Sequence, residues 1–500
     1  MSRLLRTRGI DALIAASEEP ANRLRKTLGP WSITAFGIGA VIGSGIFTLT
    51  GTAAAGKVEK IESIFHATIL DLMVNGTHAG SMMGRPGAGP AISISFLMVA
   101  IACLFAGLCY AELASMIPIA GSAYTYAYAI LGEIFAWIIG WDLILEYAVS
   151  NMSVAVGFSA YIQDLAENLF GLRLPASIAY PLLSAPGQPS GVFNVPALLI
   201  TLAVTWILVR GVKESAGANG IMVAIKIAAI AIFCLGAAGS INVQNWKPFA
   251  PHGFSGVLTG ASIVFFTYIG FDSVSTAAEE CRRPQRDLPI GIIATLIICT
   301  ILYGSVAMVL TGIAPYQSLN NDAPVAAALK ALGYNRLRVV VTFGALMGMI
   351  SSLLVYQFGQ SRIWFAMSRD GLLPRVFSRV HAKFKTPHIS TWIAGFVVGI
   401  PAGIWDIDTL AELSNIGTLF AFIVVSAGVL VLRRKQPKRP RGFRVPLVPL
   451  IPILSILCCL LLMMGLPLIT WLRFFTWLVI GMAIYFTFGR RHSVMETGTV

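Results

Sequence analysis

Long apolar stretches, separated by short polar segments, run through most of this 500-residue chain. A helix that crosses the hydrocarbon core of a bilayer needs about 20 mostly apolar residues. A scan on that basis predicts an all-α polytopic membrane protein with twelve transmembrane helices. We expect these helices at approximately residues 31–55, 90–116, 132–162, 193–210, 214–239, 254–278, 289–313, 338–366, 388–405, 409–432, 446–467 and 470–488.

The polar segments between the predicted helices are too short to fold as independent domains. The longest, residues 57–88, lies between helices 1 and 2, and we interpret it as an extracytoplasmic insertion whose middle, 61–74, has an amphipathic pattern. The chain then divides into an N-terminal segment (1–30), a core of ten helices that includes the insertion (31–432), helices 11 and 12 (446–488) and a C-terminal tail (489–500).

The composition excludes several classes of protein. Apolar residues make up 56% of the chain and charged residues 12%, with a mean hydropathy of +0.77. Soluble domains carry about 25% charged residues, so this chain is not a soluble enzyme, a disordered chain or a disulfide-stapled secreted module. The seven cysteines form no CxxC motif and histidine is rare, so we predict no metal, cofactor or redox site.

The net charge of +13 would suggest a nucleic-acid partner in a soluble protein. In a membrane protein an excess of basic residues marks the cytoplasmic side. With the N-terminus inside, 26 of the 36 Lys and Arg residues fall on the cytoplasmic side, nine fall outside, and one, Lys226, lies within a helix. The distribution therefore predicts two cytoplasmic termini and no binding of nucleic acid.

Helix 1 has a pattern that is unusual for a helix interior. Four glycines occur within nine residues, in the run Gly37-Ile-Gly-Ala-Val-Ile-Gly-Ser-Gly45. Each glycine costs ~1 kcal/mol relative to alanine in a helix. Backbone that unwinds near the middle of the bilayer frees polar groups that protein, water or a ligand must satisfy. Close packing of helices through small residues is the alternative interpretation of these glycines.

Helix 6 has a matching interruption, because Asp272 follows Gly270 by two residues in an otherwise apolar run. An ionisable residue inside the membrane is a functional hypothesis by default. Interruptions at corresponding positions of helices 1 and 6 are typical of a transporter with a five-plus-five inverted repeat and a binding site at the midplane. Half-helix N-termini attract a carboxylate and half-helix C-termini an ammonium, so this arrangement favours a zwitterion.

Two more ionisable residues lie within predicted helices. Lys226 is about twelve residues from either end of helix 5, too deep for its side chain to reach the interface. We interpret it as a proton carrier or a built-in cation near the polar pair Ser351-Ser352 of helix 8, with an unplaced helix end as the alternative. Glu146 of helix 3 shares a face with Asp142, and that face should point inward, either into the pocket or as a structural hydrogen-bond anchor.

Five strings in order carry a resemblance to a known family. The chain resembles the amino acid–polyamine–organocation permeases, and within them the bacterial cationic-amino-acid-transporter-like group. The strings are Gly37-Ile-Gly-Ala-Val-Ile-Gly-Ser-Gly-Ile-Phe47, Gly121-Ser-Ala-Tyr-Thr-Tyr126, Gly140-Trp-Asp-Leu-Ile-Leu-Glu-Tyr147, Phe266-Thr-Tyr-Ile-Gly-Phe-Asp272 and Ser368-Arg-Asp-Gly-Leu-Leu-Pro374.

The resemblance implies the five-plus-five repeat and the import of an amino acid coupled to protons, with the substrate held at the two helix breaks. The residues it implies for the substrate carboxylate come from helix 1: Ile42, Gly43, Ser44 and Gly45. Those it implies for the ammonium and the side chain come from helix 6: Phe266, Thr267 and Ile269.

The resemblance also implies roles for the charged residues. Lys226 would occupy a sodium-like space for proton coupling, and Glu146 and Asp272 would be the acidic residues near the pocket. Two departures stand out. Thr267 replaces a smaller Ala that is common in the family, and the insertion at 57–88 replaces a loop that is usually short.

These observations predict a proton-coupled uptake system in the inner membrane that works by alternating access, and not an enzyme. A sodium-coupled or exchange-mode transporter and a non-pumping sensor stay open as alternatives. A cationic substrate would use Glu146, whereas a small neutral one would use walls formed by Phe266 and Tyr356. Contact with membrane lipid is expected, and a small single-span protein beside helices 11 and 12 is left open.

Overall fold

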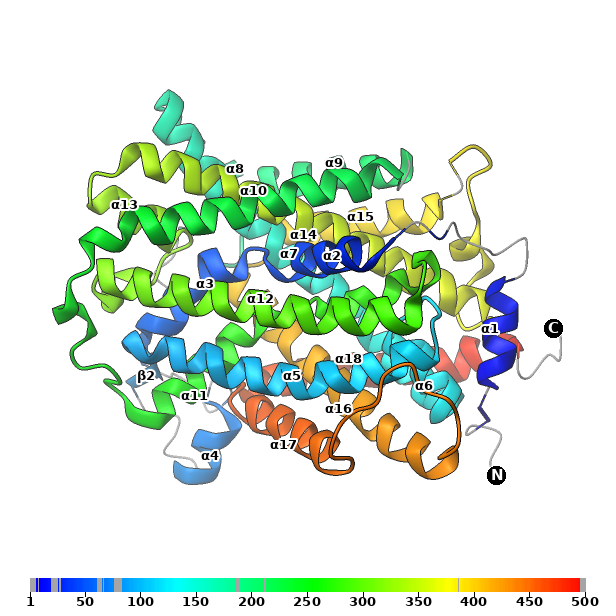
Figure 1. Ribbon diagram of the computed structural model, residues 1–500. Coiled ribbons are helices and arrows are strands. Elements are labelled where there is room, and N and C mark those ends of the chain that lie inside the picture. The colour runs from blue at the N-terminus through cyan, green and yellow to red at the C-terminus, as the bar shows by residue number, and fades with distance from the viewer. Residues whose placement is uncertain are drawn as a thin grey trace.

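The computed structural model describes residues 6–7, 9–18, 26, 28–60, 65, 67–75, 83–184, 189–210, 213–384 and 386–494. Its long helices run side by side in one bundle (Figure 1). One end of the bundle, which we call the terminal face, carries α1 (Ile10–Glu18) and α19 (Arg490–His492). The opposite end, the distal face, carries the strand pair β1 (Gly56–Lys60) and β2 (Met83–Pro86). The predicted basic residues Arg3, Arg8, Arg23 and Arg25 and the tail from 495 lie outside the described residues.

The helices of the bundle follow the apolar stretches of the sequence. Helix 1 forms as α2 (Pro30–Val41) and α3 (Gly45–Ala55), and helix 6 as α11 (Gly253–Val264) followed by the 3-10 helices η7 (Phe265–Tyr268) and η8 (Phe271–Glu280). The others are α5 (Ile92–Met116), α7 (Glu133–Phe170), α9 (Val195–Arg210), α10 (Lys213–Ala237), α12 (Pro284–Ile313), α14 (Asn335–Arg369), α15 (His388–Ala402), α16 (Ile407–Lys435), α17 (Leu450–Met464) and α18 (Leu468–Ile484). Short helices connect them: α4 (Ile69–Asn75), α6 (Ala123–Ile130), α8 (Ala176–Ala179) and α13 (Pro324–Ala331).

The structure confirms an all-α polytopic membrane protein. Within the described residues, eight helices are long and apolar enough to cross a membrane, and the bent pair α2–α3 makes a ninth. Three shorter apolar helices, α9, α15 and α17, fall inside three further predicted spans. The count of twelve crossings stays a prediction.

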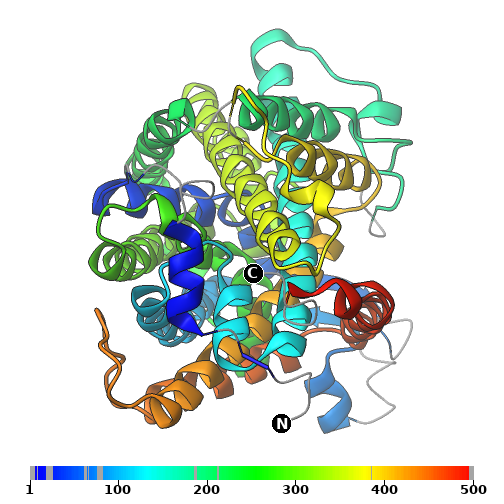
Figure 2. The ribbon, with the colours of Figure 1, turned by 90° about the vertical axis from the view of Figure 1, so that its right-hand side faces the viewer.

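Helix α2 occupies a central position in the bundle. It packs against α10, α12 and α14 and against the 3-10 segment η8 of helix 6. Around it, α7 packs against α14 and α16, and α12 packs against α5. Seen from the terminal face, the long helices appear end-on (Figure 2). The interruptions of helices 1 and 6 are therefore enclosed by protein.

The predicted insertion is folded onto the distal face. Its strands pair antiparallel, with Gly56 opposite Pro86. In the described part of the predicted amphipathic stretch 61–74, α4 begins at Ile69. Just ahead of it, the carbonyl of Ala67 accepts a hydrogen bond from the N–H of Leu468 at 3.0 Å. Arg85 of β2 is buried and forms an ion pair with Glu412 of α16. The insertion thus connects the end of helix 1 to helices 10 to 12.

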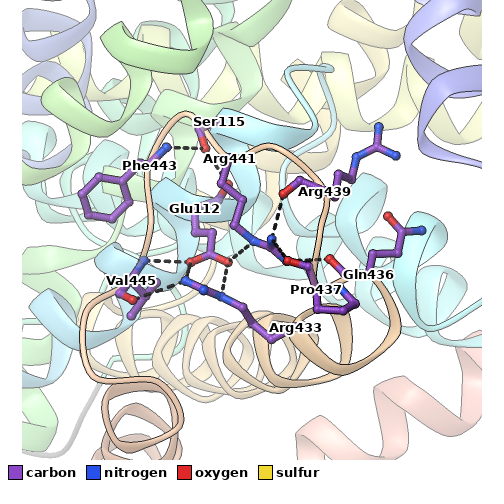
Figure 3. Close-up of polar contacts among 9 residues, drawn as sticks. All are labelled: Glu112, Ser115, Arg433, Gln436, Pro437, Arg439, Arg441, Phe443 and Val445. Atoms are coloured by element: carbon purple, nitrogen blue, oxygen red, sulfur yellow. Dashed lines mark hydrogen bonds and ion pairs between the residues drawn. The ribbon is translucent and has the colours of Figure 1, made fainter.

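A buried carboxylate organises the terminal face (Figure 3). Glu112, near the end of α5, accepts hydrogen bonds from Arg433 Nε at 2.9 Å and Nη2 at 2.7 Å, from Arg441 Nε at 3.0 Å and from the N–H of Val445 at 2.7 Å. Charge-assisted bonds of this kind are stronger than neutral ones. They tie the basic connection between α16 and α17 to helix 2.

Candidate functional site

The first half of the candidate site is the break in helix 1. The chain bends by 43° between Val41, the last residue of α2, and Gly45, the first of α3. The glycines serve close packing as well as the break, because a Cβ on Gly43 would lie 2.7 Å from Ser352 Oγ and one on Gly45 would lie 2.8 Å from Thr267 Cγ2. Both interpretations of the glycine pattern therefore describe the structure.

The break leaves a set of backbone donors at the start of α3. Within the described residues, no hydrogen-bond acceptor is found for the N–H groups of Ser44, Gly45 and Ile46. Such free N–H groups and the positive end of a helix dipole attract an anion. The N–H groups of Ile42 and Gly43 are engaged, because they donate to the carbonyls of Ile38 and Val41 at 3.0 Å each. Of the predicted residues, Ser44 and Gly45 are thus placed to donate backbone hydrogen bonds.

The second half is the break in helix 6. Here α11 ends at Val264, and Gly270 adopts φ = +113°, a left-handed conformation that glycine tolerates. A Cβ on Gly270 would also lie 2.8 Å from the Cβ of Ala40, so helices 1 and 6 meet closely. Asp272 caps the break, since its carboxylate accepts from the N–H of Gly270 at 3.2 Å and from the Tyr147 hydroxyl at 3.0 Å.

The carbonyls predicted to hold an ammonium each accept one hydrogen bond in this conformation. Phe266 O accepts from the N–H of Ile269 at 3.2 Å, Thr267 O from the Tyr303 hydroxyl at 2.8 Å, and Ile269 O from the Tyr356 hydroxyl at 2.7 Å. A carbonyl oxygen has two lone pairs, so each can accept a second bond. Tyr356 thus lies at the site, as the sequence suggested, although through its hydroxyl and not as an apolar wall.

Tyr303 of α12 is a site residue that the sequence analysis missed. Its hydroxyl lies 2.8 Å from the carbonyl of Val41 in helix 1 and 2.8 Å from that of Thr267 in helix 6. A single side chain from helix 7 therefore links the two breaks. No local sequence signal marks it, because Tyr303 is one of 13 tyrosines and lies in an ordinary apolar helix.

Lys226 lies fully buried in α10 and reaches the break of helix 1. Its ammonium donates to the carbonyls of Ile38 at 2.8 Å, Gly39 at 3.0 Å and Ile42 at 3.0 Å. A cation is favoured at the C-terminal end of a helix. Within the described residues no carboxylate forms an ion pair with Lys226. It does not lie at a helix end, as the alternative interpretation supposed.

The serine pair of helix 8 faces the same turn of helix 1. The Ser352 hydroxyl donates to the carbonyl of Ala40 at 2.7 Å. The Ser351 hydroxyl lies 3.4 Å from the carbonyl of Gly39 and donates to Asn219 Oδ1 at 2.7 Å. A Cβ on Gly348 would lie 3.3 Å from Lys226 Cδ, so the glycine leaves room for the lysine stem. The ammonium of Lys226 and the two serines therefore surround one turn of α2.

Asp142 and Glu146 of α7 are both buried, at 0% and 1% exposure. No hydrogen-bond partner is found in the described structure for either oxygen of either carboxylate. An unpaired buried charge is costly, so a carboxylate here requires a proton, a donor or a cationic ligand. Gly417 of α16 permits the approach, because a Cβ there would lie 2.7 Å from Asp142 Oδ1. The predicted inward face of helix 3 is thus confirmed.

The terminal end of helix 6 is closed by ion pairs with helix 8. Glu280 lies 3.8 Å from Arg362 and Glu279 lies 3.9 Å from Arg369. The N–H of Leu28, ahead of α2, donates to Glu280 O at 3.0 Å. Among the described ion pairs, these glutamates contact α14 and not the arginines at 282–286 that are close to them in sequence. These contacts tie the terminal end of helix 6 to helix 8 and to the start of helix 1.

Comparison with known proteins gives a consistent picture. The model of the amino acid permease family matches residues 28–488. The chain is 44% identical over 497 residues to a methylthioribose transporter of Bacillus subtilis, covering 99% of this chain and 100% of the relative. It is 45% identical over 497 residues to the branched-chain amino acid permease BcaP of the same organism, covering 99% of both chains. A chloroplastic cationic amino acid transporter of Arabidopsis thaliana is 34% identical over 85% of this chain and 69% of its own.

Proposed function

The chain belongs to the amino acid permease family, and from that premise we propose that it carries out proton-coupled uptake of an L-amino acid across the cytoplasmic membrane by alternating access. The observation that carries the proposal is the pairing of the two breaks. Unpaired N–H groups at Ser44 and Gly45 suit a carboxylate, and the carbonyls of helix 6 suit an ammonium. An α-amino acid presents both groups.

We further propose that the terminal face lies in the cytoplasm. The sorting of basic residues supports this orientation, since the cluster that surrounds Glu112 and the arginines that pair with Glu279 and Glu280 all lie there. Helices 1 to 5 and 6 to 10 would be the two inverted repeats of residues 31–432. Helices 1, 2, 6 and 7 would then rock against the rest, opening the site first to the distal face and then to the terminal face.

Lys226 is the group to which we assign the coupling. A titratable ammonium that holds three carbonyls of helix 1 links a proton directly to the position of that helix. Glu146 and Asp272 are the acidic residues that we assign to the pocket, with Asp272 orienting the break and Glu146 available for a proton or a cation. The sodium-coupled alternative would need oxygen ligands at this position, but the Lys226 ammonium already engages the carbonyls of Ile38, Gly39 and Ile42.

For the substrate we favour a neutral amino acid with a branched apolar side chain. Ile42, Phe266 and Ile269 give the breaks apolar walls, and one full-length relative carries the name of a branched-chain amino acid permease. A second candidate is methylthioribose, since an equally similar relative is named for it. Methylthioribose has no carboxylate or ammonium, so the paired donors and acceptors of the two breaks favour the amino acid.

The test is initial-rate uptake in proteoliposomes. A panel of the twenty amino acids and methylthioribose is offered with and without an inward proton gradient, and with sodium or potassium as the external cation. We expect gradient-stimulated uptake of branched apolar amino acids that does not depend on sodium. Uptake of methylthioribose alone, uptake that requires sodium, or binding without net uptake would each contradict the proposal.

A further inference from the structure

An open pocket lies on the distal side of the break in helix 1, between α3, α7 and the segments at 179–181 and 322. Its polar lining includes Thr48, Gln163, Tyr180, Asn194 and Asp322. We call it the outer pocket. It does not overlap the two breaks, where Gly45 and Thr267 lie in close contact.

The outer pocket begins one helical turn from the candidate site. The N–H of Thr48 donates to the carbonyl of Ser44 at 2.9 Å, and four residues of α-helix rise about 6 Å. The floor is tight, because a Cβ on Gly157 would lie 2.6 Å from the Cβ of Ser44. A solute that moves from the distal face to the breaks would occupy this pocket until the contact between Gly157 and Ser44 opens.

One wall of the pocket offers an unused hydroxyl. Thr48 is 1% exposed, lines the pocket, and has no hydrogen-bond partner for its Oγ1 within the described structure. A buried polar group without a partner is costly, so such groups in native structures usually meet water or a ligand. The hydroxyl of Thr48 therefore points to a polar ligand in the pocket.

The other wall is negatively charged. Asp322 is half-buried in the pocket, with Asp406 and Asp408 at the start of α16 close enough to act on its charge. Four described basic residues of this face pair elsewhere: Arg338 with Asp164, Arg85 with Glu412, and both Lys330 and Arg173 with Glu167. Within the described residues no Lys or Arg forms an ion pair with Asp322. The wall therefore selects a positively charged group.

The chemistry favours an organic ammonium over a metal ion. Asp322, Asp406 and Asp408 do not converge as a metal-binding group in the described structure. Threonine hydroxyl, glutamine and asparagine amides and a tyrosine hydroxyl beside one carboxylate suit a small solute that carries both donors and acceptors. An amino acid has this character, with its ammonium directed at Asp322.

We propose that the outer pocket is a first binding site for the amino acid, in which Asp322 contacts the ammonium and Thr48 contacts a polar group before the substrate moves to the helix breaks. This inference rests on the proposed function, because it takes the substrate to be an amino acid. It adds a second subsite to the site at the helix breaks. It also adds a requirement at the entrance, because a substrate would need a free ammonium to bind the outer pocket.

The test compares Asp322→Asn and Thr48→Val with matched controls in proteoliposomes. Glu167→Gln removes one carboxylate of the same face outside the pocket, and Thr50→Val removes a hydroxyl of the same helix that donates to the carbonyl of Ile46. Initial rates are measured with L-leucine, or with the best substrate of the panel, and 3-methylbutylamine serves as an inhibitor that has the ammonium but no carboxylate.

We expect Asp322→Asn to raise KM three- to tenfold with little change in Vmax, and to weaken inhibition by 3-methylbutylamine by a similar factor. Thr48→Val should raise KM to a smaller extent, and both controls should behave like the unsubstituted protein. An unchanged KM and unchanged amine inhibition in Asp322→Asn, or a fall in Vmax alone, would overturn the inference about the outer pocket. The proposed function would still stand in that case, because it rests on uptake by the unsubstituted protein. Absence of amino acid uptake by the unsubstituted protein would instead overturn both.

Discussion

Replacing Lys226 by methionine tests the coupling most directly. Methionine is similar in length to the lysine stem and fits beside Gly348, but it has no ammonium to donate to the break of helix 1. If the ammonium couples protons to transport, Lys226→Met should lose uptake that is driven by a proton gradient. It should keep exchange of substrate for substrate, which needs no net proton movement.

The hydrogen bonds around Lys226 indicate how much stability the Lys226→Met substitution would cost. The carbonyl of Ile38 also accepts from the N–H of Ile42 at 3.0 Å. The hydroxyl of Ser351 lies 3.4 Å from the carbonyl of Gly39, but it donates its one proton to Asn219 Oδ1 at 2.7 Å. Within the described residues, the carbonyls of Gly39 and Ile42 would therefore lose their donor. Each orphaned buried carbonyl costs about 1–3 kcal/mol, and removing a buried ammonium offsets part of that cost. The variant should therefore fold and insert, and a loss of uptake would not reflect unfolding.

The assay measures two modes of transport in the same proteoliposomes. Gradient-driven uptake should fall at least tenfold in Lys226→Met, which corresponds to about 1.4 kcal/mol of lost driving force or barrier lowering. Counterflow exchange should stay within about threefold of the unsubstituted protein, a difference under 1 kcal/mol. Lys330→Met is the control, because Lys330 is half exposed on the distal face and pairs only with Glu167 among the described ion pairs.

A second substitution separates titration from hydrogen bonding. Lys226→Gln keeps a donor for the carbonyls of helix 1 but cannot release a proton under the assay conditions. It should lose gradient-driven uptake as Lys226→Met does. Full gradient-driven uptake by either variant would refute the assignment of coupling to Lys226. If Lys226→Gln alone kept full uptake, the role of the lysine would be purely structural.

Four further predictions follow from other parts of the structure. Gly270→Ala should abolish uptake, because alanine is strained at φ = +113° and its Cβ would meet Ala40, whereas Gly304→Ala, with open space around it, should not. Tyr303→Phe should slow uptake about tenfold or more, because it leaves the carbonyl of Thr267 without its donor at a cost of about 1–3 kcal/mol. Initial uptake rates test this, with Tyr316→Phe as the control. Glu112→Gln should destabilise the protein by about 3–5 kcal/mol, because buried Arg441 loses its counter-charge, and the thermal midpoint in detergent should fall well below that of Glu167→Gln. Burial and the charges of Asp408 and Asp406 raise the pKa of Asp322 to about 6, so its charge is present above that pH and lost below it. The ratio of the KM of Asp322→Asn to the KM of the unsubstituted protein should therefore fall toward one as the external pH drops through 6.

The features that sequence predicts here are those that a local pattern encodes. Runs of about 20 apolar residues specify membrane helices whatever their neighbours are, so the class of fold follows from hydropathy. Four glycines in nine residues specify the break in helix 1, since helix propensity is itself a local property. Lys226 stands out for the same reason, because a lysine in the middle of an apolar helix is costly without a specific partner.

The features that sequence does not predict depend on which helices become neighbours. Tyr303 bridges the two breaks only because α12 packs against both α2 and η8. Glu280 pairs with Arg362, 82 positions away in sequence, and not with the arginines two to six residues away. The N–H of Ile42 was expected to face the substrate, but the last turn of α2 uses it. Each of these outcomes is set by tertiary contacts that no local window contains.

The hydrogen bonds of helix 1 suggest how the protonation of Lys226 would affect the terminal face. Lys226 holds the last turn of α2. Two residues before α2, Leu28 is bonded through its N–H and C=O to Glu280 and Arg282 at the end of helix 6. Because α2 is a continuous helix between these points, it can transmit a displacement as a rigid rod. Loss of the ammonium would release the turn at Ile42 and, through α2, strain the Leu28 contacts that lie beside the Glu280–Arg362 pair. On this argument the lysine controls the terminal closure and not the affinity of the breaks, so substitutions at Lys226 should change the direction and coupling of transport more than the KM for exchange.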